Sequence, residues 1–231
     1  MKVQLLRDFV SIFYPEVCLG CTQPLVNQEK LMCFNCLVEL PKTHFYQQAE
    51  NPVTQLFTGR IPLKKATSFL YFQKSGIVQS LIHHLKYKGF PELGQRLGAM
   101  AAREWIGTDF LKDIHALMPI PLHATKQKKR GYNQSEHIAK GISEISGLPV
   151  LSQCFHRVEA TATQTRKSRF ARWKNVETVF RVSDSAPLQN RHILLVDDVV
   201  TTGATLEAAA QQLLQIKGTQ VSLFTLAYAP A

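Results

Sequence analysis

The sequence predicts an α/β protein built on a parallel sheet, preceded by a small domain with four cysteines. Three observations predict this fold. Beyond residue 60, short apolar runs alternate with segments of helical spacing, as in a parallel sheet covered on both faces. The run His192–Val196 is almost continuously apolar, which is typical of a strand buried on both sides. Two Cys-x-x-Cys pairs lie close together near the N-terminus. We therefore expect two domains, residues 1–60 and 61–231.

The first domain is expected to open with a helix and to end in a linker. Apolar residues between Leu5 and Phe13 recur at helical spacing and predict a short amphipathic helix ahead of the cysteines. The stretch Pro41–Pro62 is polar and contains Asn51-Pro52 and Thr58-Gly59, a composition that indicates a linker. The domain boundary is accordingly placed near residue 60.

The second domain is expected to alternate between strands and helices. Short apolar runs predict strands, and apolar residues repeated every three or four positions predict helices. A polar, arginine-rich segment without periodicity separates two of the strands. The expected strands are Ala66–Phe72, His115–Ile120, Val150–Cys154, Thr178–Val182, His192–Val196 and Val221–Ala227; the expected helices are Ile77–Leu85, one that begins at Pro91, Asn133–Ser146 and Ala204–Lys217.

The charge of the chain favours anionic partners. Its 231 residues include 27 Lys and Arg against 17 Asp and Glu, a net charge of +10. Such an excess attracts nucleic acid or phosphorylated small molecules. The bases gather between Lys126 and Lys174, mostly in expected loops, although a solvated basic face has the same composition. No apolar run reaches the roughly 20 residues of a membrane-spanning helix, and no signal sequence is recognised. We expect a cytoplasmic protein without membrane insertion.

The two cysteine pairs predict a structural zinc site. Four thiolates complete a tetrahedral zinc shell, and the eleven-residue spacer between the pairs is long enough to fold back on itself. A region this small buries little apolar surface, so it needs a bound metal ion to stabilise its fold. A redox or iron–sulfur role and four free thiols are the alternatives. The fifth cysteine, Cys154, is expected to be a buried apolar residue. The predicted zinc ligands are Cys18, Cys21, Cys33 and Cys36.

The segment Ile193–Thr205 is the strongest candidate for a ligand site. An apolar strand delivers Asp197 and Asp198 to the carboxyl end of the sheet, where open α/β folds bind ligands. Small and hydroxylic residues follow, and then a helix whose first N–H groups suit a phosphate. Neighbouring carboxylates suit sugar hydroxyls or a cation. The alternative is a plain helix cap, which explains Thr202 but not the paired acids.

This segment resembles the phosphoribosyl pyrophosphate loop of type I phosphoribosyltransferases. The resemblance implies that the two acids, Asp197 and Asp198, bind the ribose hydroxyls at the catalytic centre. It also implies a fold with a type I phosphoribosyltransferase core, and Mg²⁺ bound together with phosphoribosyl pyrophosphate. The loop that would bind the 5-phosphate comprises Val199, Val200, Thr201, Thr202, Gly203, Ala204 and Thr205.

Three further segments narrow the resemblance to the ComF family, whose members are also called ComFC or GntX-like. They are His84–Gly89, Pro119–Gln134 and Gln164–Val176, and they stand beside the Cys₄ knuckle. The resemblance implies that Lys86, Lys126 and Arg130 bind the ligand, although many relatives have Arg where Lys126 stands. A solvated basic turn is the alternative for Lys126–Arg130.

The arginine-rich segment Gln164–Lys174 resembles the flap that closes over the substrate in these transferases. Gln164 is then a ligand-binding residue, and Arg166 and Arg169 are catalytic. A flap rich in Arg and without apolar anchors is ordered only when an anionic ligand recruits it. A surface loop that touches nucleic acid phosphates is the alternative reading of this segment.

The resemblance implies a transferase that attacks the ribose anomeric carbon and expels pyrophosphate, in a setting of competence and use of external DNA. No residue stands out as a general base, and the sequence does not name the acceptor. Two alternatives belong to other classes. One is a competence factor that binds single-stranded DNA, or DNA-processing proteins, through the zinc knuckle and the basic flap. The other is a regulator that senses phosphoribosyl pyrophosphate without catalysis.

Overall fold

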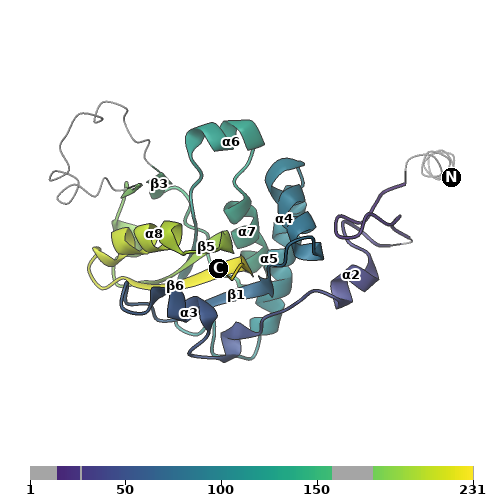
Figure 1. Cartoon of the computed structure of the whole chain (residues 1–231). Helices are drawn as coiled ribbons and strands as arrows, with labels where there is room; N and C mark the ends of the chain where they lie inside the picture. The colour runs from purple at the N-terminus through teal and green to yellow at the C-terminus, as the bar shows by residue number, and fades with distance from the viewer. Residues whose placement is uncertain (1–14, 27, 158–178, 231) are drawn as a thin grey trace, which may run out of the picture.

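The computed structural model describes residues 15–26, 28–157 and 179–230 of the chain (Figure 1). The helix expected between Leu5 and Phe13 lies outside the described residues. So does the segment Gln164–Lys174, which the sequence predicts to be a flap. The strand expected over Thr178–Val182 is described from its second residue onward.

A parallel sheet of four strands forms the centre of the fold, as predicted. Its strand order is β1-β6-β5-β2, and all three neighbouring pairs are parallel. Strand β5 extends further than the apolar run predicts, since it continues through both acids to Val200. The last residue of β2 pairs with Val196 of β5, so the acids lie just beyond the end of β2. The strands are β1 Ala66–Tyr71, β2 Ala116–Pro119, β5 His192–Val200 and β6 Gln220–Tyr228.

Three helices cover one face of the sheet, and the cysteine module packs against one of them, α4 (Figure 1). Helices α5 and α7 approach each other closely, because Gly98 and Gly141 remove the side chains between them. A Cβ on Gly98 would come within 2.3 Å of a backbone oxygen of Ile138. The cysteine module packs on the first turn of α4, where the Ser80 hydroxyl donates to the Leu19 carbonyl at 2.7 Å. The helices are α4 Ile77–Tyr87, α5 Pro91–Trp105 and α7 Gln134–Ser146, with the short α2 Phe34–Val38 in the cysteine module.

The other face is covered by α3, α8 and a small antiparallel pair of strands, β3 and β4. Phe57 of α3 and Leu206 of α8 are buried in one apolar cluster with the inner residues of the sheet. In the strand pair, Phe155 and Phe180 stack with ring centroids 5.3 Å apart. The elements are α3 Pro52–Phe57, α8 Ala204–Leu214, β3 Phe155–Arg157 and β4 Phe180–Val182, with 3-10 turns at Phe45–Gln47 and Ala186–Leu188.

The segment Pro41–Pro62 is not the linker that its polar composition suggested. It contains α3, and its residues Val53 and Phe57 are buried in the core. The polar composition suggested a linker, but polar side chains of this segment form hydrogen bonds with the backbone at the start of α3. The Asn51 side chain accepts from the N–H groups of Val53 and Thr54 and is only 2% exposed. A domain boundary near residue 60 stays a prediction.

Two other expectations differ from the structure. Lys126–Arg130 lies in a short helix, α6 Ala124–Arg130, rather than in a loop; the His123 side chain accepts from the Thr125 N–H at its start. The segment Val150–Cys154 makes one bridge to the sheet, between Val150 and Leu117, instead of a strand. Cys154 is buried, as predicted. Within the described ranges, no helix is both long and apolar enough to cross a membrane.

Candidate functional site

The two acids lie at the carboxyl end of β5 and are held by side chains from α4 and α7. Asp198 is 5% exposed. One of its carboxylate oxygens accepts from Nε2 of Gln134 at 2.8 Å, and the other pairs with Nζ of Lys86 at 2.9 Å. Asp197 accepts from the Ser135 hydroxyl at 2.9 Å and from the Asp198 N–H at 2.8 Å. Three elements of the fold therefore converge on one carboxylate pair.

Burial and the neighbouring carboxylate favour a proton on Asp197. Burial, followed by the negative charge of Asp198, raises the pKa of Asp197 to about 7. The Asp198 N–H, the Ser135 hydroxyl and the Lys86 ammonium act in the opposite direction. Asp197 thus gains or loses a proton near neutral pH, and a bound cation or hydroxyl donors would favour its charged form.

The predicted phosphate loop, residues 199–205, follows the acids directly and leads into α8. Thr201, Thr202 and Thr205 are exposed, whereas Gly203 is buried and adopts φ +77°. That left-handed conformation suits glycine. Gly203 is the N-cap of α8, with no side chain that caps the helix. The first N–H groups of a helix lack partners within the helix and attract anions, so the loop offers backbone donors and hydroxyls to a phosphate.

The segment before α7 connects the site to α4 and β2. Gly131 ends α6 with φ +80°, and the next residue, Tyr132, donates its hydroxyl to the Leu85 carbonyl. Asn133 caps α7 and donates from Nδ2 to the Ile120 carbonyl at 3.0 Å. These contacts fix the start of α7, from which Gln134 and Ser135 reach the acids.

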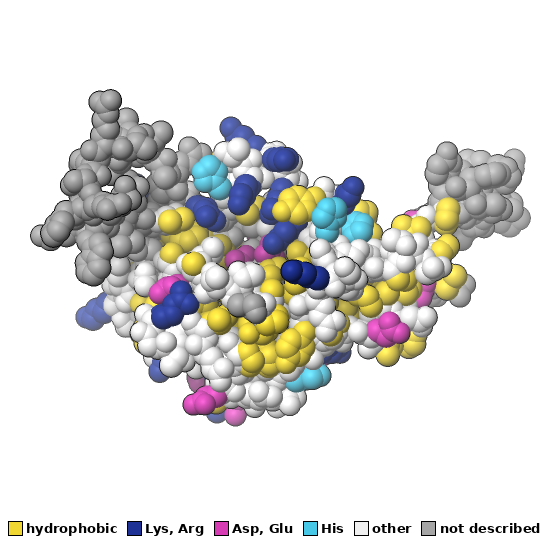
Figure 2. All heavy atoms as spheres, in the orientation of Figure 1, with side chains coloured by type: hydrophobic (Ala, Val, Ile, Leu, Met, Phe, Trp, Pro, Cys, Tyr) yellow, Lys and Arg dark blue, Asp and Glu magenta, His cyan; other side chains and the backbone are white. Residues whose placement is uncertain are grey.

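Basic side chains on α6 and at the end of α4 form a positively charged surface beside the acids. Lys126, Lys128 and Lys129 are exposed on α6, which buries none of its residues. The Arg130 guanidinium lies over the ring of Tyr87, 5.1 Å from its centroid. Figure 2 shows basic side chains gathered along the top of this face, with acidic side chains in the hollow beneath them. We call Lys88, Tyr87 and the bases of α6 the α4–α6 surface.

The structure brings together some of the predicted site residues and not others. Lys86 contacts Asp198, and the loop residues follow the acids in sequence and in space. The Arg130 guanidinium lies over Tyr87 at the end of α4, and Lys126 is exposed on α6. In the part of the chain that the structure describes, neither side chain contacts the acids. Gln164, Arg166 and Arg169 lie outside the described residues. Sequence reasoning did not assign site roles to Arg60, Gln134 or Ser135.

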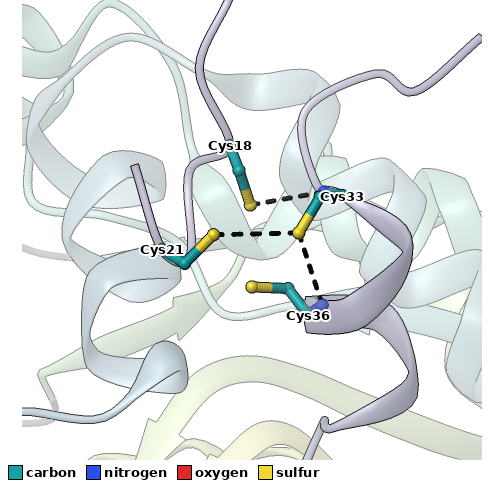
Figure 3. A group of neighbouring side chains, drawn as sticks. All are labelled: Cys18, Cys21, Cys33 and Cys36. Atoms are coloured by element: carbon teal, nitrogen blue, oxygen red, sulfur yellow. Dashed lines mark hydrogen bonds between the residues drawn. The ribbon is translucent and has the colours of Figure 1, made fainter. Parts of the chain in front are cut away.

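The four cysteines of the N-terminal module converge on one point (Figure 3). Their sulfur atoms all lie within 4.8 Å of one another. Backbone N–H groups of Gly20 and Cys33 donate to the Cys18 sulfur at 3.4 and 3.3 Å. Glu29 braces the module, since its carboxylate accepts from the N–H groups of Val26 and Phe34 at 2.9 and 2.7 Å. Four sulfurs in so small a space suit a single metal ion.

The thiol acidities agree with a cation site. Burial opposes ionisation of Cys18, but the N–H groups of Cys33, Cys21 and Gly20 outweigh it and lower the pKa of Cys18 to about 7. Burial and the neighbouring sulfurs raise the pKa of Cys36. One thiolate therefore forms readily, and a positive charge close by would favour ionisation of Cys36. The donor set fits zinc, which favours four sulfur ligands.

Comparisons with known proteins agree with this arrangement. The family described as "Phosphoribosyl transferase domain" matches residues 107–231. "DNA utilization protein YhgH" of Salmonella typhimurium is 32% identical over 149 residues, which are 63% of this chain and 65% of the relative. The protein of the same name from Escherichia coli K12 is 28% identical over 213 residues, 91% of this chain and 89% of the relative. "Competence protein F" of Haemophilus influenzae is 33% identical over 135 residues, 58% of this chain and 59% of the relative.

The family match includes β2, the whole of β5, and the loop that follows the acids. The chain belongs to the phosphoribosyl transferase domain family. Its relatives and its cysteine cluster also confirm the predicted resemblance to the ComF group, in which a four-cysteine knuckle precedes the phosphoribosyltransferase fold.

Proposed function

We propose that the chain binds phosphoribosyl pyrophosphate with Mg²⁺ at the acids and the phosphate loop. The observation that carries the proposal is the carboxylate pair, held by Gln134, Ser135 and Lys86 directly before a loop that opens a helix. The carboxylates would accept hydrogen bonds from the two ribose hydroxyls. The loop would bind the 5-phosphate through N–H groups and the hydroxyls of Thr201, Thr202 and Thr205.

Mg²⁺ fits this site only together with the ligand. Two carboxylates are too few to hold the ion alone, and Mg²⁺ is commonly bound by one or two carboxylates plus substrate phosphates. When bound, it would withdraw charge from the pyrophosphate. Lys86, Lys126 and Arg130 would add positive charge at the same end, and Arg166, Arg169 and Gln164 would complete the site from the predicted flap.

We further propose that the chain is a pentosyl transferase. The reaction would form a bond from an acceptor to the anomeric carbon while the bond to pyrophosphate breaks, with the pyrophosphate leaving as an anion. Positive side chains near the departing oxygens would stabilise that charge. The names of the relatives support a role in competence and DNA utilisation, and we propose that the reaction serves that role. We also propose a cytoplasmic location and a structural zinc ion in the four-cysteine module.

Calorimetric titration with phosphoribosyl pyrophosphate, with and without Mg²⁺, tests the binding proposal. We expect the wild type to bind and Asp198→Asn to bind at least about tenfold more weakly, because a charge-assisted hydrogen bond is worth roughly 1.5–3 kcal/mol. Asp184→Asn is the matched control, since Asp184 is exposed and lies outside the site. Absence of binding in the wild type, or equal binding by Asp198→Asn, would contradict the proposal.

The α4–α6 surface favours a second candidate function, the binding of single-stranded nucleic acid. It combines exposed lysines with Tyr87, a residue that is 62% exposed and whose ring carries the Arg130 guanidinium. Phosphates bind to such lysines, and bases stack on aromatic rings and Arg planes. The surface adjoins the acids, so a nucleic acid held there would lie beside the proposed transferase site.

Fluorescence anisotropy with a labelled oligothymidylate over a range of salt concentrations tests this candidate. Each phosphate contact contributes about −0.7 to the slope of log K against log salt for a single strand. Lys128→Gln/Lys129→Gln should therefore flatten the slope by about 1.4 and weaken binding. Lys112→Gln/Lys217→Gln removes equal charge from exposed positions outside this surface and should change the slope less. A flat salt response in the wild type would exclude the candidate.

A further inference from the structure

Arg60 contacts the phosphate loop from the segment that sequence reasoning treated as a linker. Its Nη1 donates to the Leu56 carbonyl at 2.8 Å and to the Thr202 carbonyl at 3.0 Å. Its Nη2 pairs with the carboxylate of Glu207 in the first turn of α8. A single planar guanidinium thus joins the end of α3, the phosphate loop and the helix that the loop opens.

Phe57 supports the same part of the loop. Its ring is 1% exposed and lies under the Arg60 guanidinium, with 5.8 Å between Cζ and the ring centroid. Gly203 rests directly on this ring, because a Cβ at that position would come within 2.6 Å of a ring carbon. The ring therefore supports Gly203 from one side, while Arg60 holds the adjacent carbonyl.

We propose that Arg60 is a positioning residue for the phosphate loop, fixing the Thr202–Gly203 peptide so that its N–H faces a bound 5-phosphate. The inference rests on the proposed function. The peptide is trans, so its N–H and C=O point in opposite directions. With the Thr202 carbonyl held by Arg60, the Gly203 N–H points away from Arg60. Because Arg60 is already paired with Glu207, it acts through the loop.

The arrangement requires arginine rather than any positive charge. The guanidinium offers several donors in one rigid plane, which here meet two carbonyls and a carboxylate. A lysine ammonium is a point charge on a flexible stem and does not reproduce this planar fork. Arg60→Lys is therefore an informative variant, since it keeps the charge and loses the geometry.

Two probes separate the ends of the proposed site. Ribose 5-phosphate reports on the phosphate loop, and pyrophosphate with Mg²⁺ reports on the opposite end near Lys86. In calorimetric titrations of the full chain, Arg60→Ala should lose about tenfold in affinity for ribose 5-phosphate, the effect of roughly one charge-assisted hydrogen bond. Arg60→Lys should show most of that loss, and pyrophosphate should bind both variants as it binds the wild type.

A second measurement follows the loop without ligand. Hydrogen exchange of residues 201–206 should be faster in both Arg60 variants, because the carbonyl contact that orders the loop is lost. Glu207→Gln, which leaves α8 intact, should give a smaller change in the same direction. Arg191→Ala is the matched control: Arg191 is exposed and precedes β5 at the opposite end of the sheet.

The outcomes distinguish this inference from the function on which it rests. If the wild type binds neither probe, the proposed function and the inference both fail. If the wild type binds ribose 5-phosphate and Arg60→Ala binds it equally well, only the positioning role is wrong. Equal losses for both probes, with a lowered melting temperature, would also overturn the positioning role, because they indicate general destabilisation.

Discussion

The four-cysteine site and the carboxylate site both gather negative groups, yet the protein stabilises them in opposite ways. Around the sulfurs the donors are backbone N–H groups, which lower the pKa of Cys18 to about 7 despite its burial. Around the acids the donors are mostly side chains, and burial with the adjacent charge raises the pKa of Asp197 to about 7. The four sulfurs therefore suit a bound metal ion, whereas the acids already have the Lys86 ammonium beside them as a counter-charge.

The largest effect that sharpens this comparison is expected from Cys36→Ser. Cys36 is 2% exposed and lies in the same apolar cluster as α4. The variant should lose bound zinc and more than about 3 kcal/mol of unfolding free energy, because metal-binding energy is folding energy in so small a module. Zinc content and denaturant unfolding would measure both. Cys154→Ser, a buried cysteine outside the cluster, should keep its zinc; full zinc content in Cys36→Ser would break the comparison.

A smaller effect is expected from Asp197→Asn, and it depends on pH. Because the folded-state pKa of Asp197 lies above its usual 3.8, its contribution to stability is complete below pH 4 and is lost as the pH rises through about 7. Asn keeps the oxygen that accepts from Ser135 and cannot ionise. The variant should therefore be more stable than the wild type at pH 8, by about 2 kcal/mol.

Denaturant unfolding from pH 4 to pH 8 checks this prediction. The difference between Asp197→Asn and the wild type should shrink as the pH falls and vanish near pH 4. Asp184→Asn, at an exposed position, should show no such trend. A stability difference that does not change with pH would contradict the raised pKa of Asp197.

The sequence was sufficient for the parallel sheet, the cysteine cluster and the position of the acids. Each depends on local patterns: apolar runs, Cys-x-x-Cys pairs, and two acids before a Thr-Thr-Gly loop. The contribution of α3 was missed because its polar residues act through backbone capping and through contacts with residues far away in sequence. Arg60 reaches Thr202, 142 positions later, and no local pattern indicates such a contact.

The donors to the acids show a similar limit. Gln134 belongs to the segment Arg130–Gln134, which the sequence singled out, yet its contact with Asp198 depends on how α7 packs against β5. Lys86 was predicted as a ligand-binding residue because the family resemblance included its segment. The structure places it against Asp198, and its role in binding stays a prediction. Composition alone does not distinguish it from Lys88, two residues later, which is exposed.

The smallest expected effect is that of Lys86→Met, which removes the cation from the buried carboxylate site. Asp198 would then retain Gln134 as its hydrogen-bond donor, so we expect a loss of about 1 kcal/mol at pH 7 rather than a full buried-charge penalty. Lys86→Met/Asp198→Asn should recover most of this loss. Lys88→Met is the exposed control. Denaturant unfolding measures all four proteins, and a loss that persists in the double variant would show that Lys86 acts by packing.

Thermal melting with and without phosphoribosyl pyrophosphate and Mg²⁺ tests most directly whether the acids and the loop form one ligand site. A ligand at a hundred times its dissociation constant adds about 2.7 kcal/mol to the stability of the wild type. We expect a raised midpoint in the wild type and none in Asp197→Asn/Asp198→Asn, with zinc content equal in both. An equal rise in both proteins, or no rise in the wild type, would contradict the assignment of the ligand to these acids.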